Sequence, residues 1–98
     1  MQIVENWSDI VGEVKGHHPS QSTAGFTTLK IAVKDVKPVK GFSNLLQKAK
    51  GETLEVNVPN DIIGDFDLKP GTIVSGRVRR AGLKNIFAHP EHFKISSK

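Results

Sequence analysis

The sequence predicts a mainly β fold, a small five-stranded barrel, and three observations support this. Apolar and polar residues alternate over several short stretches, which is the pattern of strands with one buried face. Turn-forming residues separate these stretches at intervals that suit short strands. Two glycines, Gly12 and Gly76, fall inside predicted strands, where a closed sheet bends or packs closely.

Four strands are predicted over residues 9–15, 26–34, 53–58 and 72–79, and a fifth lies between 85 and 95, where Pro90 interrupts it. After Val33 the alternation slips by one residue, because Asp35 stands where an inward residue is due. This slip predicts a β-bulge. The alternation assigns one set of residues to the barrel interior: Ile10, Gly12, Val14, Leu29, Ile31, Val33, Leu54, Val56, Val58, Val74, Gly76 and Val78.

The segments between the strands carry two helix patterns and one long loop. Apolar residues at Phe42, Leu45, Leu46 and Ala49 have helical spacing, which predicts a short helix over 43–50. A second short helix is predicted with Asn60 or Asp61 as N-cap; it carries Ile62, Ile63 and Phe66, and Phe66 is expected in the core. Residues 16–25 are rich in helix and strand breakers and form a predicted loop.

The order of strands, with a helix between the third and the fourth, resembles the OB fold, an oligonucleotide- and oligosaccharide-binding barrel. The extra helix departs from its simplest form, and an SH3-like barrel is the alternative. The resemblance implies a ligand face on the second and third strands and the loops at 16–25 and 80–85. Lys30, Lys34 and Asn57 would lie on that face. Glu55 would lie there too, and its charge opposes a phosphate backbone.

Length and composition indicate one domain over residues 1–98. The chain has no cysteine, which excludes disulfides and thiolate metal sites. No apolar run reaches the length of a membrane span and no signal peptide is evident, so we expect a cytoplasmic protein without membrane contact. The net charge is +4 and uneven, because residues 26–50 and 69–98 are basic and residues 51–68 hold five acids and no base.

The strongest functional signal is that every arginine of the chain lies between 77 and 80. Guanidinium groups bind phosphate and stack on bases. Alternation places Arg77 and Arg79 on one outward face, with Arg80 at the start of the following loop. Phe26 and Phe87 are the candidate stacking platforms. The predicted nucleic-acid site therefore comprises Arg77, Arg79, Arg80, Lys84, Lys30, Lys34, Phe26 and Phe87.

Catalytic and metal-binding motifs are missing from the sequence. It contains no nucleophile elbow, zinc-protease, dinucleotide or Walker motif. The histidines at 17, 18, 89 and 92 have spacings that favour surface loops over a metal site. We expect no enzyme activity, no metal and no cofactor.

Three functions remain open. The leading hypothesis is binding of single-stranded DNA or RNA with weak sequence preference. The alternative is a protein-interaction or assembly module that binds an acidic protein partner, and the third is a small metal-dependent or hydrolytic enzyme. The oligomeric state is not predicted.

Overall fold

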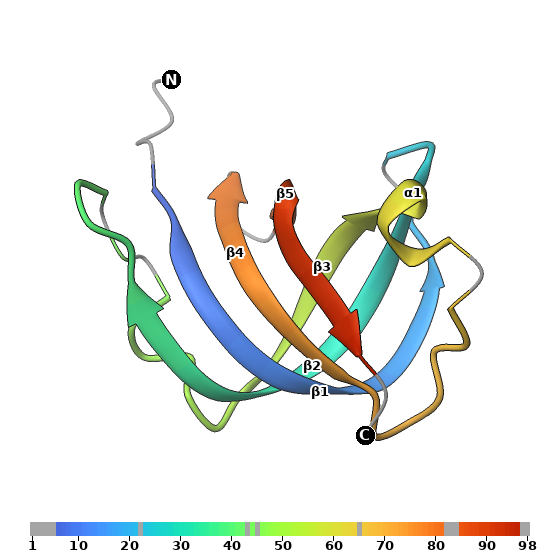
Figure 1. Cartoon of the computed structure of the whole chain (residues 1–98), viewed down its shortest axis with the longest axis horizontal. Helices are drawn as coiled ribbons and strands as arrows, with labels where there is room; N and C mark the ends of the chain where they lie inside the picture. Colours follow the sequence, from blue (N-terminus) through green and yellow to red (C-terminus); the bar gives the residue numbers. More distant parts are fainter. Residues whose placement is uncertain are drawn as a thin grey trace.

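The computed structural model describes residues 6–21, 23–42, 44, 46–64, 66–81 and 85–96, which form five strands and one turn of helix. The strands close into a barrel in the order β1-β2-β3-β5-β4, with β4 returning to β1. All neighbouring strands are antiparallel except β3 and β5, which are parallel (Figure 1). The elements are β1 Ser8–Pro19, β2 Phe26–Pro38, β3 Thr53–Pro59, α1 Asn60–Ile63, β4 Ile73–Ala81 and β5 Asn85–Ser96.

The barrel interior is filled by the predicted inward residues. Val56 and Val74 are fully buried, and so is Ile31, whereas its neighbour Lys30 is exposed, so the predicted strand registers are correct. Leu54 is only partly buried and packs against the edge of this core. The fifth strand, which the sequence left undefined, adds three buried side chains: Ile86, Ala88 and Phe93.

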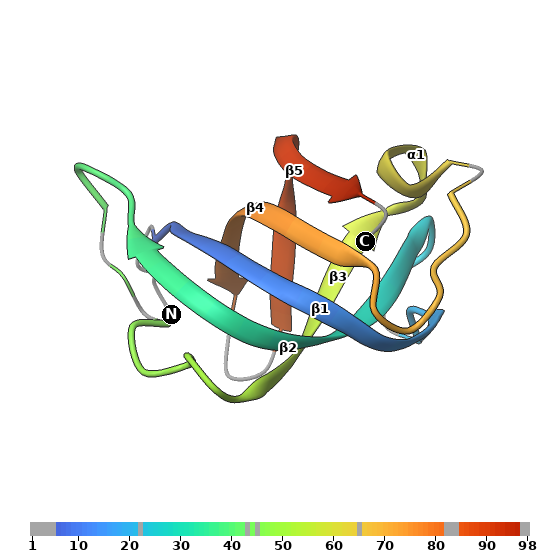
Figure 2. The same ribbon diagram turned by 60° about the horizontal axis from the view of Figure 1, so that its bottom comes forward.

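The predicted bulge in β2 is confirmed. Val11 pairs with Asp35 and Gly12 with Val33, so Lys34 between them has no partner on β1. A second irregularity lies in β1, where the pairing skips Lys15. An extra residue bends a strand and increases its twist, and closing a five-stranded sheet requires such bends. In Figure 2, β1 and β2 run side by side as long curved strands.

Gly12 and Gly76 stand where the barrel leaves no room for a side chain. A Cβ at Gly12 would meet the side chain of Ile31 and the carbonyl of Ala32. A Cβ at Gly76 would collide with the backbone of His92 and Phe93, and its φ of 149° is itself unfavourable for other residues. Both glycines thus allow close approach of two backbones, as predicted for barrel strands.

In the described residues of 43–50, turns stand in place of the predicted helix, and the Ala49 N–H donates to the Leu46 carbonyl three residues back. The segment is tied to β2 instead, because Val33 exchanges backbone hydrogen bonds with residues 51 and 52. Leu46 and Ala49 are buried, so the apolar spacing anchors a turn on the core. Ser43 and Leu45 lie outside the described residues.

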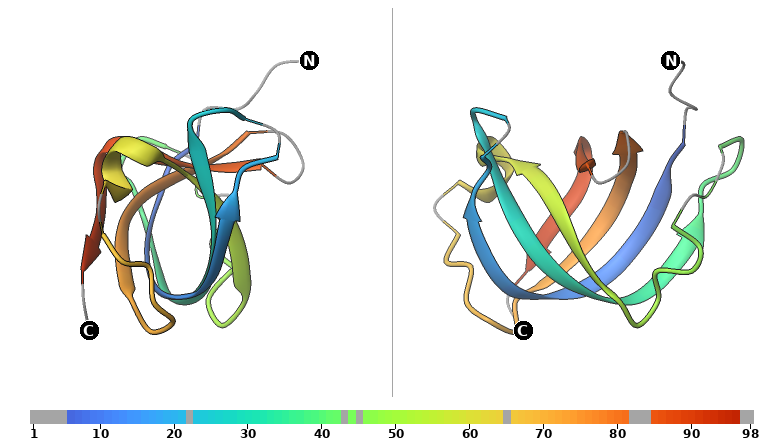
Figure 3. Two further views of the ribbon diagram at one scale, coloured as in Figure 1. Left: turned by 90° about the vertical axis from the view of Figure 1, so that its right-hand side faces the viewer. Right: turned by 180° about the vertical axis from the view of Figure 1, so that it is seen from behind.

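The second predicted helix is reduced to the single turn α1. Pro59 takes the N-cap position, not Asn60 or Asp61, and Gly64 ends the turn. Phe66 is 36% exposed, so its prediction as a core residue is wrong. The turn lies at one end of the barrel, beside the end of β3 (Figure 3).

Three strands run well past their predicted ends. β1 continues through Pro19 into the expected loop, β2 continues from residue 34 to Pro38, and β4 continues to Ala81. β5 runs past Pro90, but residues 89–92 drop out of the pairing, since Val78 pairs with Ala88 and Gly76 with Phe93. Pro90 lacks an N–H and is tolerated where no ladder bond is needed. No helix in the described part of the chain is long and apolar enough to span a membrane.

Candidate nucleic-acid interface

One row of residues crosses the outside of the barrel over all five strands. The pairings run from β1 through β2, β3 and β5 to β4, and each partner stands directly beside the next. Side chains of paired residues lie on the same face of a sheet. The members of this row are His18, Thr28, Asn57, Phe87 and Arg79.

Three partly exposed aromatic rings lie on or beside this row. Phe26 of β2 and Phe87 of β5 meet edge to face, with ring centroids 5.7 Å apart, although β3 separates their strands. Asn57 stands on β3 between these strands, and its side chain is buried. Each of the two rings keeps part of its surface in solvent.

Trp7, which is not among the predicted site residues, is the third ring. The side chain of Asn6 holds both backbone groups of Arg80: its Oδ1 accepts from the Arg80 N–H and its Nδ2 donates to the Arg80 carbonyl, each at 2.9 Å. Ser8 pairs with Val78, so Trp7 stands beside Arg79. The Trp7 ring packs against the His89 ring, with ring centroids 4.9 Å apart. We call Trp7, Phe26, Arg79 and Phe87 the aromatic strip.

The three arginines have different surroundings, and Arg80 lies within β4, not at the start of a loop as predicted. Arg77 and Arg79 do point outward, but the Arg77 Nε donates to the Asp9 carboxylate at 3.3 Å. Arg79 makes no ion pair with any residue that the structure describes. Arg80 continues β4 with the inward parity of Val78 and pairs with Ile86, so it leaves the outer face.

The predicted lysines differ in the same way. Lys30 is exposed and stands across from Glu55 on β3. The Lys34 Nζ lies 3.5 Å from the Glu13 carboxylate, which Lys15 also approaches at 3.6 Å. The charges of Lys15 and then Lys34 lower the pKa of Glu13, against the opposing effect of partial burial. Lys84 lies outside the described residues.

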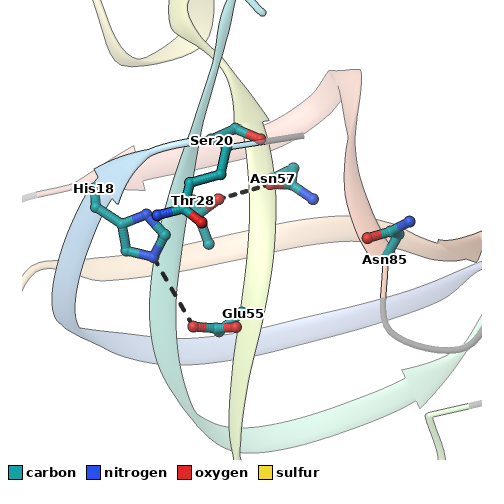
Figure 4. A pocket seen from close by; sticks show the side chains of 7 residues that line it. His18, Ser20, Thr28, Glu55, Asn57 and Asn85 are labelled. Atoms are coloured by element: carbon teal, nitrogen blue, oxygen red, sulfur yellow. Dashed lines mark hydrogen bonds and ion pairs between the residues drawn. The ribbon is translucent and has the colours of Figure 1, made fainter. Parts of the chain in front are cut away.

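A polar pocket of about 240 Å³ opens on the row beside the aromatic strip (Figure 4). Within it, the Thr28 hydroxyl donates to the Asn57 Oδ1 at 2.7 Å, and this hydrogen bond is buried. The His18 Nε2 lies 3.9 Å from the Glu55 carboxylate. The expected ligand face thus contains a real depression. Its walls come from β1, β2, β3 and β5 and include His18, Ser20, Thr28, Glu55, Asn57 and Asn85.

A second, more open cleft of about 380 Å³ lies between β1, β4 and the unpaired segment of β5. It contains the Asp9–Arg77 ion pair and the side chain of His92. The rings of His89 and His92 are 4.6 Å apart. Across the described ranges, no three histidine, aspartate or glutamate side chains gather in a group that could hold a metal ion.

Comparison with known proteins identifies the fold. No protein-family model and no curated protein matches the chain. Among solved structures, the N-terminal domain of the PriB protein from Thermoanaerobacter tencongensis, described as dimeric, superposes with a TM-score of 0.54. The match covers 95% of this chain and 96% of that one, at 18% sequence identity.

The chain has an OB fold. The strand order and this superposition decide against the SH3-like alternative. In OB folds, ligands lie on the outer face of the second and third strands and on the loops at its edges. The polar pocket occupies that face here, and the aromatic strip borders it across β5 and β4.

Proposed function

We propose that the protein is a non-catalytic module that binds single-stranded DNA or RNA, with weak overall sequence preference. The nucleic acid lies across the outer face of β2, β3, β5 and β4. The observation that carries this proposal is the aromatic strip, in which an arginine without an ion pair in the described chain lies between Trp7 and Phe87. Bases stack on such rings whatever their identity, and the guanidinium binds the backbone phosphates.

The charges of the outer face support the same path. Arg79 and Lys30 form no ion pair with a described residue, so contact with a phosphate would not break an existing interaction. Arg77 and Lys34 already face Asp9 and Glu13. The binding path therefore includes Arg79 and Lys30, and Arg77 and Lys34 contribute less.

The direct test is fluorescence anisotropy with labelled single-stranded DNA, single-stranded RNA and duplex, at several salt concentrations. We expect the wild-type protein to bind single strands more tightly than duplex, with affinity that falls as salt rises. Absence of binding at low salt would overturn the proposal in favour of an acidic protein partner.

Arg79→Ala and Arg77→Ala form a matched pair of variants, since both remove an outward arginine from β4. Loss of one phosphate contact in Arg79→Ala should flatten the salt slope by roughly 0.7. It should weaken binding similarly for every sequence, because phosphates carry no sequence information. Arg77→Ala should change the slope less, as its charge is already engaged by Asp9. Equal effects of the two substitutions would show that the aromatic strip is not the path.

A further inference from the structure

The polar pocket has a chemistry that phosphate binding does not explain. Glu55 places a carboxylate in its wall, and that side chain is 60% exposed. A carboxylate repels a phosphate backbone, so on a nucleic-acid surface it has to meet another kind of group. If the proposed function holds, that group belongs to the bound nucleic acid.

The Glu55 carboxylate is available as a hydrogen-bond acceptor. The His18 Nε2 lies 3.9 Å from it, which is longer than a hydrogen bond. An ionised carboxylate accepts hydrogen bonds at both oxygens and can hold two adjacent donors at once. Glu55 is therefore suited to a ligand with two neighbouring N–H groups.

Asn57 supplies the complementary group. Its side chain is buried, and its Oδ1 accepts the hydroxyl of Thr28 at 2.7 Å, which fixes the amide orientation. The amide nitrogen is thereby directed away from Thr28 and remains a donor (Figure 4). Residues 55 and 57 are two apart on β3, so both side chains face the same side of the sheet.

A carboxylate that accepts two hydrogen bonds, beside an amide that donates one, matches a single nucleobase. Guanine carries two adjacent donors, N1–H and the 2-amino group, next to the O6 acceptor. Adenine and cytosine each place only one donor group on that edge, and thymine and uracil place carbonyls on both sides of a single N–H. We infer that this pocket binds the Watson–Crick edge of one guanine in a single-stranded nucleic acid.

Pocket size and surroundings fit this assignment. The volume of about 240 Å³ lies below the roughly 300–1,000 Å³ of pockets that enclose drug-sized ligands, so it suits a group the size of one base. Asn57 pairs with Phe87, so the ring pair of Phe26 and Phe87 borders the pocket at its Asn57 end. When one base occupies the pocket, the adjacent bases of the same strand would thus be placed to stack on the aromatic strip.

The test uses labelled oligothymidines of about 12 nucleotides, within the range that one OB fold covers. One strand carries a single central guanine, one carries hypoxanthine at that position, and one is all thymine. Hypoxanthine differs from guanine only by lacking the 2-amino donor. By anisotropy, the wild-type protein should prefer guanine over either alternative by about tenfold, the effect of losing a hydrogen bond to a charged group.

Glu55→Gln should reduce this preference to near unity, because an amide accepts at one atom only. Glu52→Gln removes the same charge from an exposed residue just before β3 and should keep the preference. Both charge losses should slightly strengthen binding of the all-thymine strand, which makes no use of the Glu55 carboxylate. The preference is a ratio within each protein and is therefore independent of that change.

The outcomes separate the two proposals. Equal wild-type affinity for the three strands overturns the guanine pocket and leaves the proposed function standing. Absence of binding to any strand overturns both. A preference that survives in Glu55→Gln overturns the role of the carboxylate. Should Glu55→Gln melt early, the wild-type comparison of guanine with hypoxanthine still decides.

Discussion

Arg77 and Arg79 lie two residues apart on β4 and point to the same side of the sheet, yet their surroundings differ. Around Arg77, β1 supplies the Asp9 carboxylate at 3.3 Å. Around Arg79, β5 supplies the ring of Phe87, and the segment before β1 supplies Trp7. The same residue type on the same strand is engaged in one region and available for a ligand in the other.

The difference shows that a cluster of cations does not define a binding face by itself. An exposed ion pair contributes little to stability, about 0–1 kcal/mol, but it must be broken before the arginine can bind a phosphate. An aromatic neighbour leaves the guanidinium charge available and adds a surface for stacking. The strands that flank each arginine therefore decide its role.

The largest expected effect is a loss of stability on substitution of Gly76, which lies on β4 next to the surroundings of both arginines. Gly76 immediately precedes Arg77, and a Cβ there would collide with the backbone of His92 and Phe93. Gly76→Ala should lower the free energy of unfolding by about 2–4 kcal/mol and disturb both regions together. Urea unfolding measures this loss.

Gly16→Ala is the control for Gly76→Ala. A Cβ at Gly16 would meet only the flexible Lys30 side chain, at 3.9 Å, so stability should change by no more than about 0.5 kcal/mol. Equal effects of the two substitutions would contradict the close approach at Gly76.

The next largest expected effect is on nucleic-acid affinity and concerns only the aromatic strip around Arg79. Phe87→Leu keeps apolar bulk on β5 but removes the ring face, and should cost about 1–3 kcal/mol of binding free energy if one base stacks there. Phe42→Leu is the matched control, because Phe42 is 39% exposed on the segment between β2 and β3. Anisotropy with single-stranded oligonucleotides measures both. An unchanged affinity in Phe87→Leu would show that the surroundings of Arg79 are no more a binding surface than those of Arg77.

The smallest expected effect is on the pH dependence of stability, and it concerns Lys15 and Lys34, which are paired with Glu13 of β1. Because Lys15 and Lys34 lower the pKa of Glu13 below its ordinary 4.5, this carboxylate stabilises the fold above that pH. The contribution is lost as the pH falls through the lowered pKa. Lys15→Ala should raise the pKa of Glu13, and its stability difference from wild type should vanish in acid. Lys50→Ala should leave the Glu13 pKa unchanged. An NMR titration of the Glu13 carboxyl follows both.

The local pattern of apolar and polar residues predicted the structure correctly where burial alone decides it. The inward sets, the slip after Val33 and the two strand glycines were predicted because alternation and close packing act over a few residues. It failed for the segment 43–50, where the spacing of Leu46 and Ala49 suits a turn on the core as well as a helix. Phe66 failed for a related reason, since α1 ends at Gly64 before that residue could reach the interior.

The sequence by itself determined the mainly β class, the strand registers and the outward direction of Arg77, Arg79 and Lys30. Only the tertiary structure decided which of these residues have a common surface. The parallel pairing of β3 with β5 sets Asn57 beside Phe87, and the return of β4 to β1 sets Asp9 against Arg77 and Trp7 beside Arg79. These neighbours are far apart along the chain, and barrel closure, driven by burial of one shared core, brings them together.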